Sequence, residues 1–183
     1  MKKEQKECLR YAFEGETDMG INSSKMIMFH VPEDKELLAA FGEVAIRHEH
    51  MSYILKMIIR TLTEVSVEEA VKATAYENIS QIRTRINKIA RTKLGEGEAL
   101  KKLQAILSDC KCLTDKRNEL THCLWTQELD GEAQLRDPYG NTQLLPTAQD
   151  LFNLAKSIEE VTKRINYERF EGFLYQALSQ KGV

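Results

Sequence analysis

The segment EALKKLQAILSDCKCLTDKRNELTHCLW, from Glu98 to Trp125, decides the fold because its apolar residues recur at helical spacing. Most are separated by three or four positions: Leu100, Leu103, Ile106, Leu107, Cys110, Leu113, Leu120 and Leu124. At about 100° per residue, most of them fall within one sector of a helix. Arg117 projects into the middle of that sector. The segment therefore predicts a long helix that packs against other helices and carries one arginine on its packing face.

Two more long helices are predicted before this segment. The first begins at VPEDKELL, from Val31 to Leu38, where proline and acidic residues suit a first turn. Its apolar stripe has one gap, which His48 fills. The second begins with a capping box at Ser66 and Glu69, and it is expected to run unbroken to the glycines of KLGEGE, from Lys93 to Glu98.

The pattern changes after this third helix. LWTQELDGEAQLRDPYGNTQLLP, from Leu124 to Pro146, alternates in polarity and contains turn signals at DG and DPYGN. A small β-hairpin or short meander is expected at about residues 124–145, with Trp125 packing it onto the helices. A last helix is expected to begin at Pro146 or Thr147 and to continue as far as Leu178.

These segments together predict an all-α fold: a four- to five-helix up-and-down bundle with a small β-hairpin insertion before the last helix. Nothing in the sequence marks a domain boundary, so residues 1–183 are expected to form a single domain. The N-terminal end is expected to hold a short helical piece followed by a loop at EGETDMGINSSK, from Glu14 to Lys25.

Composition narrows the classes of function. Of the 183 residues, 42% are apolar, which is enough for one core, and a net charge of -2 gives no overall basic field. A nucleic acid would therefore need a local basic patch. No apolar run approaches the ~18 residues of a membrane span, so no membrane partner is expected. The four cysteines lack CxxC pairs, which favours free thiols in a reducing compartment, and the protein is expected in the cytoplasm.

Arg117 needs an explanation, because an arginine on a packing face is costly unless its guanidinium is paired and hydrogen-bonded. One explanation is an internal salt bridge, for which Glu43, Glu49 and Glu159 are the candidate partners. The other is a binding site.

The neighbours of Arg117 favour the binding site. Thr121 lies one turn along on the same side, while Asn118 and His122 are four residues apart and flank the stripe together. Guanidinium, amide, hydroxyl and imidazole groups would then line one edge of a groove. This set is suited to holding a phosphate and moving a proton.

At these residues the sequence resembles the HEPN superfamily, whose all-helical bundles carry an arginine, then a polar residue, and a histidine four to six residues further on. Arg117, Asn118 and His122 match this motif with four intervening residues, and a trailing aromatic such as Trp125 is also seen in many members. The resemblance covers the arrangement of the long helices, and its sequence-specific part is these few positions.

The resemblance implies an endoribonuclease that uses no metal or other cofactor and works as a homodimer with its motif helices facing each other. The RNA 2'-hydroxyl would attack the adjacent phosphate and leave a 2',3'-cyclic phosphate and a 5'-hydroxyl. His122 would handle a proton, Arg117 would stabilise the charge on the phosphate, and Asn118 would orient the imidazole or the phosphate.

Three further residues are assigned to binding: Lys116, Thr121 and His48. His48 has the alternative of a satisfied core histidine. HEPN proteins occur in toxin–antitoxin, phage-defence and RNA-processing settings, so an antitoxin or another protein partner is also implied. The alternative function is a non-catalytic HEPN-type module that binds nucleotides or RNA or assembles with proteins.

Metal sites are not expected. Glu119 and His122 have the Glu-x-x-His spacing of di-iron bundles, but the sequence has no second such pair. His48 and His50 diverge by about 200° on a helix and cannot share an ion. Basic residues crowd the end of the second predicted helix: Arg83, Arg85, Lys88, Arg91 and Lys93. They predict a solvated face, with a track for an RNA backbone as the alternative.

Overall fold

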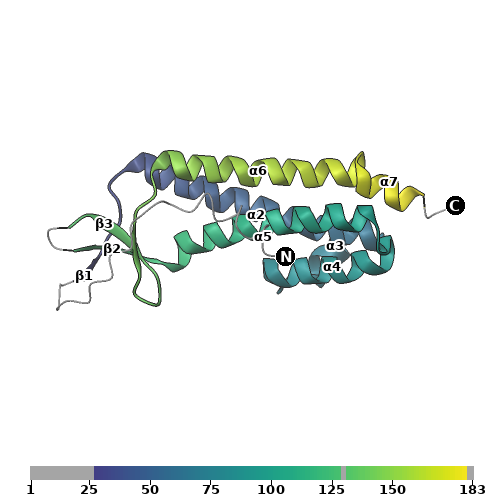
Figure 1. Cartoon of the computed structure of the whole chain (residues 1–183), viewed down its shortest axis with the longest axis horizontal. Helices are drawn as coiled ribbons and strands as arrows, with labels where there is room; N and C mark the ends of the chain where they lie inside the picture. Colours follow the sequence, from purple (N-terminus) through teal and green to yellow (C-terminus); the bar gives the residue numbers. More distant parts are fainter. Residues whose placement is uncertain (1–26, 129–130, 181–183) are drawn as a thin grey trace.

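The computed structural model describes residues 27–128 and 131–180 and shows an elongated helical bundle with a small sheet across one end (Figure 1). The long helices are α2 (Lys35–Thr63), α4 (Ile79–Leu94), α5 (Glu98–His122) and α6 (Ala148–Phe170). The short helices are α3 (Val67–Ala73) and α7 (Phe173–Ser179). The helical bundle predicted from the apolar spacing is thus confirmed in its coarse form.

Helices α2 and α6 lie side by side and run in the same direction (Figure 1). Arg47 of α2 is 3.1 Å from Glu159 of α6, and further along both helices Arg169 donates a hydrogen bond to Thr61 at 3.0 Å. The seam is apolar because one stripe of each helix is fully buried, including Leu55 and Ile158. This seam forms the centre of the core and fixes the face of α2 that is left for α5.

The second predicted helix is wrong as a single element, because the chain turns between α3 and α4. The Ser66 capping box starts α3 as expected, but a second capping box of Asn78 and Gln81 starts α4. The apolar spacing continues across the break, yet Tyr76 there is fully exposed. Since Asn78 satisfies helix N–H groups better as a cap than within a helix, a new helix begins there.

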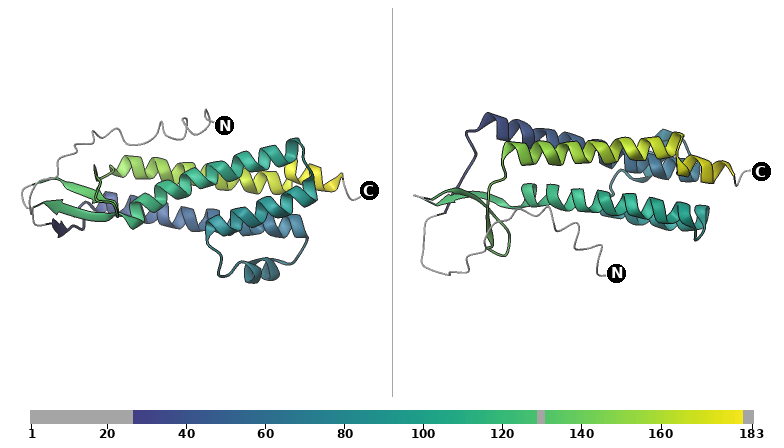
Figure 2. Two further views of the ribbon diagram at one scale, coloured as in Figure 1. Left: turned by 60° about the horizontal axis from the view of Figure 1, so that its bottom comes forward. Right: turned by 45° about the horizontal axis from the view of Figure 1, so that its top comes forward.

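This turn also changes the topology. Helix α5 is antiparallel to α4 across the turn at Gly95, and it is antiparallel to α2, since Phe41 contacts Trp125 while His48 contacts Thr114. Helices α2 and α4 are therefore parallel, because α3 and its flanking turns carry the chain back along the bundle (Figure 2). The up-and-down order holds from α4 to α6 and is wrong between α2 and α4.

The last helix begins as predicted and ends early. Thr147 caps α6 and forms a capping box with Asp150. The helix stops at Phe170 and α7 starts at Phe173, so an unbroken helix to Leu178 is wrong. At the break, the Glu168 carboxylate accepts a hydrogen bond from the Phe173 N–H at 2.8 Å, and a Cβ at Gly172 would lie 2.8 Å from the Glu168 Cα. The close approach requires glycine and separates the two helices.

The predicted hairpin or short meander is one part of a four-stranded antiparallel sheet, which is larger than expected and lies at one end of the mostly helical bundle. Strands β2 (Leu124–Glu128), β3 (Ala133–Arg136) and β4 (Thr142–Leu144) form a meander, and β1 (Ile27–Phe29) pairs with β2. Strand β1 is not predicted from the sequence, because three apolar residues show no usable alternation. Its pairing adds an edge strand contributed from before α2.

Trp125 packs the sheet onto the bundle, as predicted. Its ring meets Phe41 edge to face with centroids 5.6 Å apart, and its Nε1 donates to the Leu120 carbonyl at 3.0 Å. Leu135, its cross-strand partner, is buried on the same face. These contacts fix the direction in which the chain leaves the end of α5.

Some expectations concern other parts of the chain. The N-terminal helical piece and the loop at residues 14–25 lie outside the described residues, as does Cys8.

Cys110 and Cys123 are free thiols, whereas Cys112 is disulfide-bonded, so the prediction of a free thiol at Cys112 is wrong. The lack of CxxC spacing therefore does not exclude a disulfide. Within residues 27–128 and 131–180, no helix is long and apolar enough to cross a bilayer.

Candidate functional site

The last turns of α5 extend past the beginning of α4 and are not covered by it (Figure 2). Helix α4 has 16 residues and α5 has 25, and a short turn joins the end of one to the start of the other. At 1.5 Å per residue, α4 therefore runs beside roughly the first two-thirds of α5. The remaining third carries residues 117–122, so α4 does not run beside the motif.

Arg117 is half-buried between α5 and α2, with 24% of its side chain exposed. Its Nη1 donates to Asn118 Oδ1 at 3.2 Å, and its Nη2 is 4.0 Å from Glu49 Oε1. Its Nε is buried and has no hydrogen-bond partner within the described residues. The guanidinium is thus only partly satisfied by the protein.

The structure decides among the three candidate salt-bridge partners. Glu43 and Glu159 both pair with Arg47, at 3.3 and 3.1 Å, and so are not partners of Arg117. That leaves Glu49, whose side chain is 70% exposed. An ion pair at this distance with so exposed a carboxylate contributes at most about 1 kcal/mol. It does not offset the burial of the Arg117 Nε.

His48 of α2 lies close enough to Arg117 for the two groups to interact electrostatically, and only 4% of its surface is exposed. Its Nε2 is 3.3 Å from the Thr114 hydroxyl, which itself donates to the Cys110 carbonyl at 2.7 Å. Because that hydroxyl proton is already used, Nε2 must be the donor and carry the imidazole proton. Nδ1 then has a free lone pair, 3.7 Å from Glu49 Oε1. His48 is therefore held through its Nε2–H group by one defined hydrogen bond.

Burial lowers the pKa of His48 below its ordinary value, and the nearby Arg117 charge lowers it further. In the unfolded chain the pKa returns to about 6.5. Between the two values the unfolded chain binds a proton that the folded chain does not, so stability falls as the pH drops below about 6.5.

We expect the free energy of unfolding in urea to be smaller at about pH 5.5 than at about pH 7.5, and His48→Gln to reduce that difference. His50→Gln is the matched control, because His50 is exposed on the same helix. An unchanged pH dependence in His48→Gln would show that His48 is not the group that titrates.

The other motif residues differ in exposure. Asn118 is half-buried and joined to Arg117, whereas Thr121 is exposed and its hydroxyl donates to the carbonyls of Arg117 and Asn118 at 3.2 and 3.3 Å. Thr121 therefore supports the helix backbone. Lys116 is half-buried, and burial lowers its pKa.

His122 is the last residue of α5 and is exposed. In the described chain, no hydrogen bond or ion pair joins it to Arg117, Asn118 or His48. Five residues of helix separate the Arg117 and His122 directions by about 140°, whereas Asn118 and His122 differ by only about 40°. One copy of the chain therefore places Arg117, Asn118 and His48 together and leaves His122 facing solvent beside them.

Comparison with protein-family models, curated proteins and solved structures finds no match. The functional assignment therefore depends on the site itself. Sequence reasoning missed Thr114, which sets the tautomer of His48. Its place three residues before Arg117 on the buried stripe is the only signal that the sequence offers.

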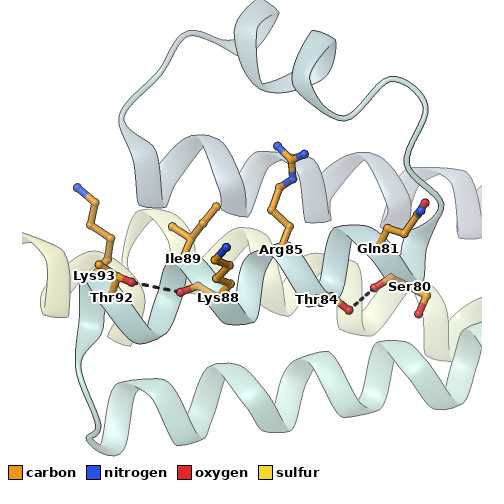
Figure 3. A pocket seen from close by; sticks show the side chains of 8 residues that line it. All are labelled: Ser80, Gln81, Thr84, Arg85, Lys88, Ile89, Thr92 and Lys93. Atoms are coloured by element: carbon orange, nitrogen blue, oxygen red, sulfur yellow. Dashed lines mark hydrogen bonds between the residues drawn. The ribbon is translucent and has the colours of Figure 1, made fainter.

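A second polar feature is an open groove of about 700 Å³ along α4 (Figure 3). Its lining includes the cations Arg85, Lys88 and Lys93 together with hydroxyl groups such as that of Thr84. Helix α4 contains no acidic residue, although Arg85 pairs with Glu77 from the preceding turn. The predicted solvated basic face is thus hollowed, which suits contact with a phosphate backbone.

Within the part of the chain that the structure describes, no group of three or more His, Cys, Asp or Glu side chains is arranged to hold a metal ion. His48 is buried and His50 is exposed, which agrees with their expected divergence.

Proposed function

We propose that the protein is an endoribonuclease of HEPN type that cleaves RNA by attack of the 2'-hydroxyl on the adjacent phosphate. The observation that carries the proposal is the incompletely paired guanidinium of Arg117, half-buried with an unpartnered Nε and a 4.0 Å contact to Glu49. A buried cation with unused donors is stabilised by an anion, and a guanidinium matches a phosphate in geometry and charge.

The proposed reaction forms a bond between the 2'-oxygen and phosphorus and breaks the bond from phosphorus to the 5'-oxygen. One group takes the proton of the 2'-hydroxyl, and another gives a proton to the departing 5'-oxygen. Arg117 stabilises the negative charge that develops on the phosphate, and His122 performs one of the two proton transfers. Asn118, which already contacts Arg117, orients the phosphate or the imidazole.

The proposal includes a homodimer with the motif helices facing each other. A single chain supplies one exposed histidine near Arg117, whereas the reaction has two proton transfers. A second copy related by a twofold axis would supply a second His122 and a second Arg117. Light scattering after size exclusion tests this step.

A non-catalytic RNA-binding or protein-assembly module is the second candidate. It is favoured by the lack of a contact between His122 and Arg117 in one chain and by the basic groove on α4. In that case RNA binds and is not cut. An antitoxin or another protein partner fits either candidate, and the proposal keeps the cytoplasm as the location.

The test is incubation of an end-labelled RNA and a DNA of the same sequence with the full-length protein in excess EDTA. We expect the RNA to be cleaved and the DNA to survive, because DNA lacks the attacking hydroxyl. Binding of RNA without cleavage would favour the second candidate, and cleavage of both polymers would rule out 2'-hydroxyl attack.

A further inference from the structure

A second group of arginines lies at the end of the bundle opposite the sheet, where α2 and α6 run side by side (Figure 1). Arg169 of α6 is only 5% exposed. Its Nε donates to the Thr61 hydroxyl at 3.0 Å, and its Nη1 donates to Asn166 Oδ1 at 3.0 Å. The guanidinium also lies 4.9 Å from the Phe170 ring centroid. Every one of these partners is neutral.

Arg60 of α2 adds a second positive charge. It precedes Thr61 in the chain and lies close enough to Arg169 to lower the pKa of that arginine, after the larger effect of burial. The Nε of Arg60 is buried and has no hydrogen-bond partner within the described residues. Two guanidinium groups therefore lie near each other, one on a buried side chain and the other on a half-buried one.

Two neighbouring arginines in a protein normally form an ion pair with at least one carboxylate. Within residues 27–128 and 131–180, neither Arg60 nor Arg169 forms an ion pair with an acidic residue. Glu168, the neighbour of Arg169 in sequence, accepts a hydrogen bond from the Phe173 N–H at 2.8 Å instead. A buried charge without an opposite charge is costly, so an external anion would lower the free energy of this arrangement.

We propose that Arg60 and Arg169 form an anion site that binds the phosphate group of a ligand. Thr61 and Asn166 hold Arg169 through two of its five N–H groups, so three remain for the ligand. Two neighbouring guanidiniums match a doubly charged phosphate monoester better than a singly charged carboxylate. The half-exposed rings of Tyr53 and Phe170 give the site an apolar flank. This site is separate from the α5 motif and does not depend on the proposed ribonuclease.

The test measures the thermal midpoint of the full-length protein with three probes at matched ionic strength. Inorganic phosphate and adenosine monophosphate, a phosphate monoester, both offer a phosphate group that can carry two negative charges. A 2'-O-methyl RNA with hydroxyls at both ends offers only singly charged internal diesters and resists cleavage. We expect inorganic phosphate and adenosine monophosphate each to raise the midpoint in a saturable way. A rise with the oligonucleotide alone would point to RNA binding at the α5 motif or the α4 groove and would contradict a phosphate site at Arg60 and Arg169.

Arg60→Gln and Arg169→Gln should abolish the rise, and Arg164→Gln, which changes an exposed arginine further back on α6, should keep it. If Arg169→Gln does not fold, Arg60→Gln decides the matter, since its side chain is half-exposed. No rise with any probe, or an equal rise in Arg60→Gln, would overturn the proposal.

Discussion

Replacing His122 by alanine should lower the rate of RNA cleavage by a factor of about 10² to 10⁴. This is the usual effect of removing a side chain that gives or takes a proton in the transition state. The imidazole is exposed at the end of α5, and this helix carries no other histidine. The rate should be measured in single turnover with enzyme in excess.

The fold should survive this change, because an exposed side chain away from the core usually alters stability by less than about 0.5 kcal/mol. His50→Ala is the matched control and should cleave at the wild-type rate, since His50 is an exposed histidine on α2. If His122→Ala retains most of its activity while remaining folded, His122 has no part in the reaction.

Replacing Arg117 by alanine should lower the cleavage rate by about 10² to 10³, the usual cost of losing one preorganised donor to a developing anion. Arg117→Lys should rescue little of this loss, because lysine keeps the charge and lacks the planar fork that binds two phosphate oxygens. Arg164→Ala is the control, since it removes an arginine whose contact to Asp109 lies on the exposed surface.

Stability distinguishes a functional arginine from a structural one. Because Arg117 has an unpartnered Nε and only a 4.0 Å contact to Glu49, Arg117→Ala should leave the free energy of unfolding unchanged or increase it. The change also removes a charge that lowers the pKa of His48. A loss of about 3 kcal/mol or more would instead indicate a well-formed buried salt bridge, and the motif would then have a structural explanation.

The sequence predicts elements whose signals are local. Helix α5 follows from its apolar spacing, and the glycine at position 95 ends α4 where expected. Helix α6 follows Thr147, which agrees with the predicted start at Pro146 or Thr147. Each of these signals lies within a few residues of the feature it predicts, so tertiary contacts do not override it.

The features that the sequence does not predict depend on contacts with distant residues or on local signals that compete with each other. The spacing from Val71 to Ile79 fits one helix, and only the competing cap at Asn78 splits it into two. Strand β1 exists because β2 offers it an edge. At the site, the half-burial of Arg117 agrees with its place on the stripe, but the contact of His48 with Thr114 and the pairing of Arg47 with two glutamates depend on how the helices pack.

The most direct test of the central claim is the chemistry of the RNA ends after digestion in excess EDTA, read by mass spectrometry. Attack by the 2'-hydroxyl, with Arg117 holding the phosphate and His122 moving a proton, predicts a 2',3'-cyclic phosphate on one fragment and a 5'-hydroxyl on the other. Fragments with a 3'-hydroxyl and a 5'-phosphate would show attack by water on a different path and would contradict the account.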